Sequence, residues 1–526
     1  MLSVSIYTLG CKLNQLESEA LASAFIHSGF SLLPDDYIPV QPPPSRLAER
    51  TAAGEAPIPD LVIINTCTVT SRSDQKARRI IRLFLRNCPF SPVIVTGCYA
   101  KLDGEKIADL EREEAVEPDG TESSSFESCA SSLEHSAGRR LFVIAEKSSL
   151  LDLPAFLRES FIQDNAAAAA PAGTGAPAGA SALADSVAAW LARKGTEGEA
   201  ASAAADAASG GFCCFPEKFF FHTRGFLKIQ DGCDNHCTYC RIRLARGPSV
   251  SMPAARILEE LRALELRGYW EAVLTGVNIS QYYDETLPGS KGLGGLLRFL
   301  IAGTGSIGLR LTSLEPDTID EDFAGVLAQP RIRPHFHLSV QSGSAAVLKR
   351  MGRKYTGSTV EQAVSLFRQV KNKPFLACDI IAGFPGETAA DFEDTCALCQ
   401  KIEFAWIHAF PYSKRPGTPA CSFPQTVTER DAASRVERLF AMARQGRENY
   451  VKSWLGAELE AVIEKGGGSR LEFCRGLSEN YLKLLIQGPC AAAPAPGTVV
   501  RCTVSELVCQ SLKNEYPNAD AVATLQ

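Results

Sequence analysis

Three cysteines lie close together near the middle of the chain, in the segment DGCDNHCTYC. Cys233, Cys237 and Cys240 have the spacing C-x3-C-x2-C, which lets three sulfurs from one short loop reach a single metal centre. Either His236 or a distant residue completes a zinc site, or one metal position stays open, as a catalytic centre requires. Tyr239 precedes the last cysteine, and we expect its ring to pack against this centre.

A second set of cysteines is spread over the N-terminal part of the chain. Cys11, Cys67 and Cys98 each close a predicted strand, in the sequences TLGC, INTC and VTGC. Ligands of an open α/β sheet bind outside the carboxyl ends of its strands, so we expect the three thiols to meet at one edge. Helix N-termini at that edge lower thiol pKa values and favour an anionic cluster. The alternative is three unrelated core cysteines, but Gly10 and Gly97 allow tight turns before two of them.

The composition of the whole chain is that of a globular protein with several domains. Its 526 residues are 45% hydrophobic and 22% charged. A formal net charge of −6 argues against a wholly basic nucleic-acid-binding protein, although a local basic patch remains compatible with it. The sequence shows no signal peptide or membrane span. We therefore expect a cytoplasmic protein, in which 18 cysteines indicate metal or cluster binding rather than disulfides.

Strand and helix patterns alternate over residues 1–162 and predict an α/β domain with a parallel sheet. Asn14 is expected to cap the first helix. Loop insertions are predicted at about 40–58 and 111–138. Residues 163–215 consist mainly of Ala, Gly, Pro and Ser and are predicted to form a disordered linker, in which DSVAAWLARK could form a turn or two of helix.

Residues 216–448 contain six strand-like runs that alternate with helices, from GFLKIQ to FAWIHAFPYS, and predict a partial (βα)6 barrel with a parallel sheet. A long helix is expected from Glu429 to Trp454. Residues 449–526 show strand patterns in AELEAVIEK, YLKLLIQ, GTVVRCTVSEL and CQSLKNEY. These patterns predict a small all-β barrel of five strands, a fold that can bind RNA.

The cysteine loop resembles the signature of radical S-adenosylmethionine (SAM) enzymes. The resemblance implies that Cys233, Cys237 and Cys240 hold a 4Fe–4S cluster whose fourth iron binds SAM, which is then cleaved to a 5′-deoxyadenosyl radical. With the N-terminal cysteines and the β tail, the chain resembles the MiaB-like methylthiotransferase family, whose order is cluster domain, radical SAM core and TRAM domain. GCKLNQLESE, INTCTVTSRSDQKARR, SVQSGSAAVLKRMGRKYT and FPYSKRPGTPA are most similar to the branch that modifies N6-threonylcarbamoyladenosine in tRNA.

This resemblance implies a second 4Fe–4S cluster on Cys11, Cys67 and Cys98, which handles the sulfur to be inserted. The implied product is 2-methylthio-N6-threonylcarbamoyladenosine at position 37 of tRNA, next to the anticodon. One SAM methylates the sulfur carrier, and a second supplies the radical that takes the hydrogen from C2 of adenine.

Other positions are carried over from the same family motifs. The resemblance implies SAM contacts at Thr275, Gly276, Gln341, Ser342 and Gly383, each of which could equally be part of an ordinary strand-to-helix turn. Arg353 and Lys354 could meet the carboxylate of SAM or of the threonylcarbamoyl group, or could form a solvated basic turn. The chain departs from the family at residues 241–244, where Arg, Ile, Arg and Leu stand in place of an apolar pair and a proline.

Six basic residues cluster on one predicted helix beside Cys67: Arg72, Lys76, Arg78, Arg79, Arg82 and Arg86. They form either a solvated helix face or a contact for tRNA phosphates. The expected partners are a tRNA substrate, a flavodoxin- or ferredoxin-like electron donor and a sulfur source, with no membrane, for a monomeric protein. Two alternatives stay open, namely a methylthiotransferase for isopentenyladenosine-37 tRNA or a ribosomal protein, and a non-catalytic RNA-binding protein with structural metal sites.

Overall fold

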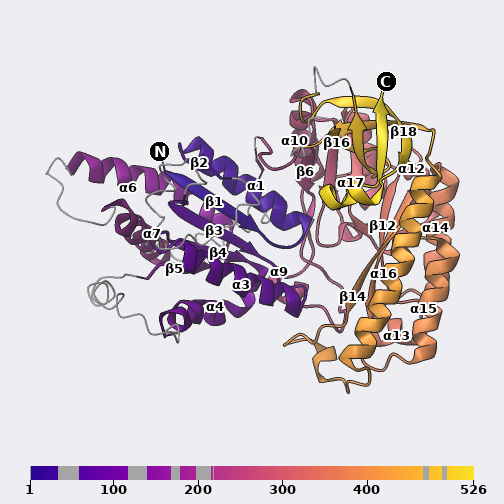
Figure 1. Ribbon diagram of the computed structural model, residues 1–526, viewed down its shortest axis with the longest axis horizontal. Coiled ribbons are helices and arrows are strands. Elements are labelled where there is room, and N and C mark those ends of the chain that lie inside the picture. The colour runs from indigo at the N-terminus through magenta and orange to yellow at the C-terminus, as the bar shows by residue number, and fades with distance from the viewer. Residues whose placement is uncertain are drawn as a thin grey trace. The chain divides into compact units, whose positions relative to one another are not determined.

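The computed structural model describes residues 2–33, 58–116, 139–167, 178–196, 212, 215–216, 218–465, 473–488 and 494–526. The chain forms two compact units, Met1–Phe221 and His222–Gln526 (Figure 1). Of the two predicted loop insertions, residues 40–57 and 117–138 lie outside the described residues. Residues 111–116, the predicted start of the second insertion, form the end of a helix instead. None of the helices in the described ranges has the length and apolarity that crossing a bilayer requires.

The N-terminal unit is built on a five-stranded parallel sheet with the order β2-β1-β3-β4-β5. The strands are β1 (Ser3–Thr8), β2 (Ser31–Leu32), β3 (Leu61–Thr66), β4 (Val93–Gly97) and β5 (Leu141–Ile144). β3 and β4 are buried along their whole length, as expected for parallel strands that are covered on both faces. Thr66 is aligned with Gly97, so the two strands end at the same level.

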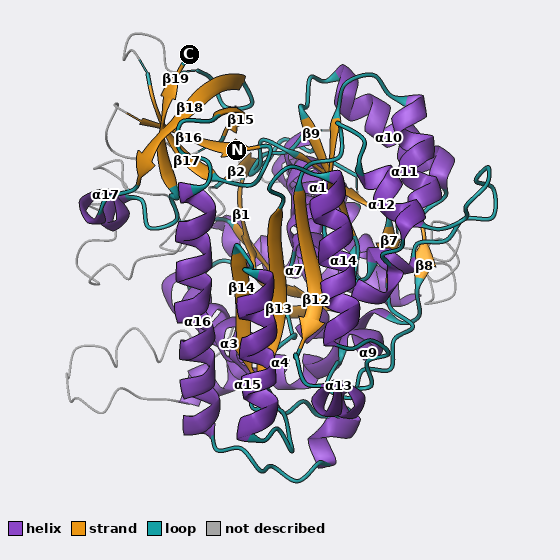
Figure 2. Cartoon of the chain, turned by 90° about the vertical axis from the view of Figure 1, so that its right-hand side faces the viewer, coloured by secondary structure: helices purple, strands orange, loops and turns teal. Residues whose placement is uncertain are grey.

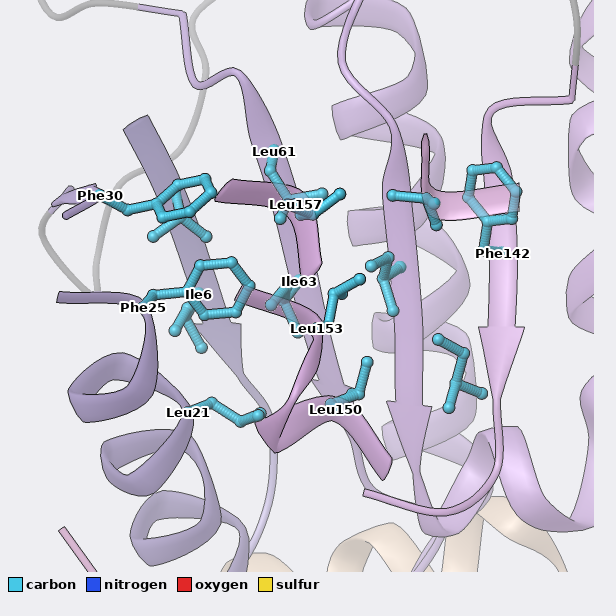
Figure 3. Close-up of a cluster of buried hydrophobic side chains, with 14 of the residues drawn as sticks. Ile6, Leu21, Phe25, Phe30, Leu61, Ile63, Phe142, Leu150, Leu153 and Leu157 are labelled. Carbon is cyan, nitrogen blue, oxygen red and sulfur yellow. The ribbon is translucent and has the colours of Figure 1, made fainter. Parts of the chain in front are cut away.

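Helices cover both faces of this sheet. They are α1 (Lys12–His27), α3 (Ser71–Asn87), α4 (Cys98–Val116), α6 (Leu153–Ala167) and α7 (Ala178–Thr196). Successive side chains of a strand point to opposite faces. Leu61 and Ile63 therefore pack with α1, α6 and α7, while Val62 and Ile64 pack with α3 and α4. Figure 3 shows the first of these two cores, in which Ile63 lies among Leu21, Phe25 and Leu153. The predicted α/β domain with a parallel sheet is confirmed.

Helix α7 corrects the linker that composition predicts over 163–215. Leu183, Val187 and Trp190 follow one another at helical spacing, and all three are buried in the core that α1 and α6 form on the sheet. The surrounding Ala, Gly and Ser residues conceal this short apolar face. Helix α6 also continues past the predicted boundary, to Ala167.

The C-terminal unit contains seven strands that build a partial barrel: β6 (Gly225–Lys228), β9 (Glu271–Thr275), β10 (Gly308–Leu311), β11 (Ser313–Leu314), β12 (His335–Gln341), β13 (Phe375–Ala382) and β14 (Trp406–Pro411). They form two parallel sheets, β10-β9-β6 and β11-β12-β13-β14, which meet where β10 continues into β11. The six predicted strand runs are therefore all present, one of them divided into two strands.

Helices pack on the outer side of this barrel. They include α10 (Ala254–Leu266), α11 (Leu293–Gly303), α12 (Glu321–Leu327), α14 (Gly357–Val370), α15 (Ala389–Ile402) and α16 (Glu429–Lys452). Figure 2 shows α14, α15 and α16 lying in front of β12, β13 and β14. The predicted long helix corresponds to α16. Short elements complete the cysteine loop region: β7 (Gln230–Asp231), α9 (Ile242–Arg246), β8 (Val250–Ser251) and α13 (Ala345–Met351).

A closed five-stranded barrel ends the chain, as predicted, with the order β15-β16-β17-β19-β18. Its strands are β15 (Glu458–Ile463), β16 (Phe473–Ser478), β17 (Lys483–Gln487), β18 (Val499–Leu507) and β19 (Ala521–Leu525). The segment CQSLKNEY, which was expected to be a strand, contains the short helix α17 (Gln510–Glu515) instead. Leu512 packs beside the barrel, and the polar residues around it stay at the surface.

A buried ion pair holds this small barrel against the partial barrel. Arg310 donates two hydrogen bonds to the Glu271 carboxylate, at 2.6 and 2.7 Å, and further ones to the carbonyls of Ser478 and Glu479 in the small barrel. Burial raises the pKa of Glu271, but Arg310, Arg224 and Arg333 together hold it below its ordinary value. The carboxylate is therefore charged, and the contact is an ion pair at neutral pH.

Trp190→Ala tests whether α7 belongs to the N-terminal core. Removing this buried ring leaves a cavity, and we expect a loss of about 3–5 kcal/mol in the free energy of unfolding of the N-terminal unit. Hydrogen exchange of β1 and β3 in increasing urea measures this loss. Ala188→Ser, at an exposed position of the same helix, is the matched control. Equal protection in both variants would show that α7 contributes nothing to the core.

Candidate active site

The structure places Cys11, Cys67 and Cys98 at the carboxyl ends of neighbouring parallel strands. Cys11 is the N-cap of α1, Cys67 directly follows β3, and Cys98 begins α4 directly after β4. Burial, together with the nearby thiols of Cys11 and Cys98, raises the pKa of the Cys67 thiol to about 11. The three sulfurs are therefore close enough to interact electrostatically, and Cys11 is exposed at the rim.

Two glycines make room for this arrangement. Gly10 has φ +108°, and a Cβ there would lie 2.5 Å from the Cβ and 2.9 Å from the sulfur of Cys67. Gly97 has φ +100°, and a Cβ there would lie 2.3 Å from the Thr66 carbonyl oxygen. Any side chain would be strained at either position and would push the strand ends apart.

Asn14 does not cap the first helix, contrary to the sequence prediction. The helix begins at Lys12 with Cys11 as its N-cap, so Asn14 already lies in the first turn. Its amide is fully buried and donates to the carbonyls of Leu9 at 2.7 Å and Thr66 at 3.0 Å. Leu9 directly follows β1, and Thr66 is the last residue of β3. One side chain thus joins the two turns that carry Cys11 and Cys67.

Lys147 completes this region and was missed by the sequence analysis. Its ammonium group donates to the Asn14 side-chain oxygen at 3.1 Å and forms an ion pair with Glu17. Only 13% of the side chain is exposed, and its charge partly offsets the burial that raises the pKa of Cys67. The segment AEKSSL carries no motif, so only the buried acidic residue on α1 could have indicated that a cation lies nearby.

The three central cysteines lie in the loop between β7 and α9. Thr238, in the middle of this loop, donates to the carbonyl of Met351 at 3.0 Å and to that of Arg350 at 2.9 Å. Its own carbonyl accepts from the Ala420 amide at 2.8 Å. Gly232 opens the loop with φ +68°, where a Cβ would lie 1.8 Å from the Pro248 carbonyl oxygen. The end of α13 and the turn at Ala420 therefore fix the conformation of the loop.

The thiols of this loop are suited to a positively charged metal centre. Burial raises the pKa of Cys233, Cys237 and Cys240, the last to about 11, and Arg353 opposes the rise at each of them. The amide of Ile242 donates to the Cys240 sulfur at 3.4 Å. Thiolates that bind a metal must lose their protons, and iron supplies the charge that makes this favourable.

Among the described residues, no three His, Cys, Asp or Glu side chains converge tightly enough to enclose one metal ion. A 4Fe–4S cluster interposes its own iron and sulfide atoms between the cysteines, so its ligands do not need to meet at one point. His236 is exposed, and its Nδ1 lies 2.9 Å from the Arg243 guanidinium. This position does not favour His236 as the fourth ligand of a zinc site.

Arg353 connects the cysteine loop to the ends of the barrel strands. Its Nη1 donates to both carboxylate oxygens of Glu315 at 2.8 Å, and its Nη2 donates to the Tyr239 hydroxyl at 2.9 Å. Glu315 also accepts from Asn235 of the loop at 3.2 Å and from Asn278 at 3.4 Å. Burial raises the pKa of Glu315, and Arg353 opposes that rise. Lys354 is exposed.

The five positions expected to contact SAM lie at the carboxyl ends of three strands. Thr275 ends β9 and Gly276 follows it, Gln341 ends β12 and Ser342 follows it, and Gly383 follows β13. Gln341 has φ +65°, an uncommon conformation for a residue with a side chain. The Ser342 hydroxyl is fully buried 3.2 Å from that of Thr395, and a Cβ on Gly383 would lie 2.6 Å from Ala432. These two side-chain positions face α15 and α16. The amides of Ser342 and Gly383 donate to the Val340 carbonyl at 2.8 Å and to the Glu387 carboxylate at 2.6 Å, so neither amide is available to a ligand.

Asn14→Ala tests the tie between the first two cysteine turns. Two buried carbonyls lose their donor, and we expect a loss of about 1–3 kcal/mol in the free energy of unfolding of the N-terminal unit. Hydrogen exchange of β1 and β3 in urea measures it. Gln15→Ala, at the half-buried neighbouring position, should cost less than the buried change. An equal cost would mean that the amide does not hold the turns together.

Known protein families match two parts of the chain. Residues 227–399 match the Radical SAM superfamily, and residues 48–116 match a family described as Uncharacterized protein family UPF0004. The chain is 38% identical to threonylcarbamoyladenosine tRNA methylthiotransferase MtaB of Treponema pallidum, over 96% of this chain and 98% of that protein. It is 31% identical to the protein of the same name from Thermotoga maritima, over 88% and 87%.

A relative with a different printed substrate matches part of the chain. The tRNA-2-methylthio-N(6)-dimethylallyladenosine synthase of Agrobacterium fabrum is 37% identical, over 48% of this chain and 56% of that protein. Both kinds of relative are tRNA methylthiotransferases, and the superfamily match implies a 4Fe–4S cluster and SAM as cofactors. The donor set of the cysteine loop fits such a cluster. The chain therefore belongs to the MiaB-like tRNA methylthiotransferase family of radical SAM enzymes and, within it, to the MtaB-type branch.

Proposed function

We propose that this enzyme methylthiolates C2 of N6-threonylcarbamoyladenosine at position 37 of tRNA. The observation that carries the proposal is the presence of two cysteine triads, one at the carboxyl ends of three parallel strands and one in the loop between β7 and α9, in a chain similar over almost its full length to the Treponema pallidum enzyme. The triad in the loop suits radical formation. Insertion of a sulfur atom requires a second cluster, which the other triad would hold.

Cys233, Cys237 and Cys240 would hold the radical cluster, which cleaves SAM when it is bound and reduced. The loop bonds of Thr238 keep the three thiols together, and the Arg353 charge favours their deprotonated form. Thr275, Gly276, Gln341, Ser342 and Gly383 would contact SAM at the strand ends. Arg353 and Glu315 supply one cation and one anion for the charged amino-acid part of SAM.

Cys11, Cys67 and Cys98 would hold a second 4Fe–4S cluster, which supplies the sulfur for transfer. Three thiols at one sheet edge, without a fourth cysteine directly beside them in the sequence, suit a cluster with one open iron. Lys147 places a positive charge at this edge, which favours an anionic cluster and an anionic sulfur ligand.

We further propose that residues 216–448 form the catalytic core and that the small barrel of residues 449–526 binds tRNA as a TRAM-like domain. On α3, Arg72, Lys76 and Arg79 are exposed and available to phosphates, whereas Arg78 donates to the Tyr99 hydroxyl and Arg82 forms an ion pair with Glu113. A flavodoxin- or ferredoxin-like protein would provide electrons and a separate donor the sulfur. The enzyme would act as a cytoplasmic monomer.

A second candidate substrate is isopentenyladenosine at the same tRNA position. The 37% identity to the dimethylallyladenosine synthase, over about half of this chain, favours it as the alternative. The two candidates share the cysteine chemistry and differ only in the group on N6 of adenine.

Alanine variants of the six cysteines separate the roles of the two triads. Replacing Cys233, Cys237 or Cys240 should abolish formation of 5′-deoxyadenosine, because radical generation requires all three ligands. Replacing Cys11, Cys67 or Cys98 should leave that product but abolish methylthiolation. Liquid chromatography of SAM products measures the first, and iron and sulfide content shows which cluster is lost. Cys509→Ala, an exposed cysteine, is the control. Normal SAM cleavage in all six variants would contradict the assignment.

Nucleoside mass spectrometry tests the substrate. In a strain without the gene, tRNA should lack 2-methylthio-N6-threonylcarbamoyladenosine and keep the unthiolated nucleoside, and expression of this chain should restore the product. The methylthio derivative of isopentenyladenosine is the internal control and should not change. A loss of that derivative instead would establish the second candidate.

A further inference from the structure

The edge strand of the partial barrel displays a row of rings on one face. Along β14, Ile407 and Ala409 are buried, whereas Trp406, His408 and Phe410 occupy the alternate positions. Phe410 is 39% exposed and His408 is exposed as well. Three rings in a row on a solvent-accessible strand face are uncommon in a folded protein and indicate a binding surface.

The register shows that this row faces the barrel interior. Ile407 is aligned with Cys378 of β13, whose thiol forms a hydrogen bond with Cys399 of α15, so these residues face the outer helices. Figure 2 shows α15 and α16 on that side of β13 and β14. Because side chains alternate along a strand, Trp406, His408 and Phe410 point to the opposite side, into the barrel.

A polar group lies beside the rings on the same inner face. Asp379 of β13 is aligned with His408, and its carboxylate lies 3.0 Å from Nε2 of His337 on β12. The rings of His337 and His408 stack with centroids 5.1 Å apart and planes 11° from parallel. Ala377 lies between the strands that carry them and is small enough to leave room for this stack.

Hydrogen bonding orients one of these imidazoles. Trp406 Nε1 donates to Nδ1 of His408 at 3.3 Å, so this nitrogen is the acceptor and Nε2 carries the proton. Burial raises the pKa of Asp379, but His337, His408 and Arg353 outweigh it and hold the pKa below its ordinary value. The carboxylate is therefore charged. The Nε2–H of His408 can therefore donate to a ligand, whereas His337 donates through Nε2 to Asp379 and keeps Nδ1 as an acceptor.

The row of rings leads toward the cysteine loop. Phe410 is aligned with Ile381, which packs in one cluster with Tyr239 of that loop and with Phe384. Arg353, which donates to the Tyr239 hydroxyl of the same loop, also interacts with Asp379 through its charge. A planar ligand that lies on Phe410 would thus have one edge directed toward the radical centre.

We propose that the inner face of β14, with Trp406, His408 and Phe410, and the adjoining His337 and Asp379 form a base platform that binds a purine unstacked from an RNA loop. Chemistry at C2 requires that the base leave its stack, and aromatic side chains hold such bases by stacking. The ring stacks on Phe410, an acceptor atom of the adenine or of its N6 substituent accepts a hydrogen bond from Nε2 of His408, and an N–H of that substituent donates to Nδ1 of His337. This platform would explain how the enzyme holds its target base. The choice of RNA as its ligand rests on the proposed function.

Binding of anticodon stem–loop RNA with and without the target base tests the platform. The probes are the same RNA with adenosine or with an abasic sugar at the target position. Phe410→Ala should weaken binding of the adenosine RNA about 10-fold and leave binding of the abasic RNA unchanged, because only the stacked base is lost. Phe410→Tyr keeps a ring and should bind both RNAs as the original protein does. Leu266→Ala, 89% exposed on the outer helix α10, is the surface control.

Cleavage of SAM without RNA is measured in every variant as the test of an intact radical core, and Leu266→Ala is expected to leave it unchanged. If Phe410→Ala and His408→Ala bind both RNAs as tightly as the original protein, the platform is overturned and the proposed function stands. If the original protein methylthiolates only isopentenyladenosine RNA, the proposed substrate fails, while a base-dependent loss of affinity in Phe410→Ala still supports the platform.

Discussion

Both candidate sites depend on the parallel direction of the strands. In a parallel sheet every strand ends at the same edge, and each following helix or loop begins there. Cys11, Cys67 and Cys98 lie at such an edge in one unit. In the other unit, the strand ends carry Glu315 and lead to Arg353, which contacts the cysteine loop. Residues far apart in the sequence meet without any additional element to bring them together.

The same edges bury thiols, which has an electrostatic consequence. A thiol out of water resists ionisation, and the pKa values of Cys67 and Cys240 rise to about 11. Each site therefore carries a buried or half-buried cation, Lys147 in one and Arg353 in the other. Both cations are held by acidic side chains, Glu17 and Glu315. Their positions are consequently independent of any ligand, so each site is organised before a cofactor binds.

Stability and chemistry occupy opposite ends of the partial barrel. Glu271 begins β9, and its carboxylate accepts from Arg310 in the ion pair that docks the small C-terminal barrel. The cysteine loop lies at the carboxyl ends of the strands. In barrels of this kind the amino-terminal end generally serves stability and the carboxyl end serves catalysis. The small barrel is therefore attached without obstructing the strand ends that carry the site.

The sequence alone determined the parts that depend on local spacing. The C-x3-C-x2-C loop, the alternation of strands and helices and the five-stranded barrel all follow from patterns within short windows, and the fold was confirmed. Helix α7 was misread because its apolar face is only Leu183, Val187 and Trp190 in an Ala-rich segment. Asn14 was misread because its buried amide satisfies carbonyls at Leu9 and Thr66, the second of which is distant in the sequence.

Only the tertiary structure decided which polar groups meet. Lys147 reaches Asn14 across more than a hundred residues, and His337 reaches Asp379 through the register of β12 and β13. A change of that register by one residue would turn the Asp379 side chain to the helix-covered face of the sheet. Register and the packing of helices on the sheet result from burial summed over the whole core. No short window of sequence contains that sum, which is why these contacts could not be predicted from it.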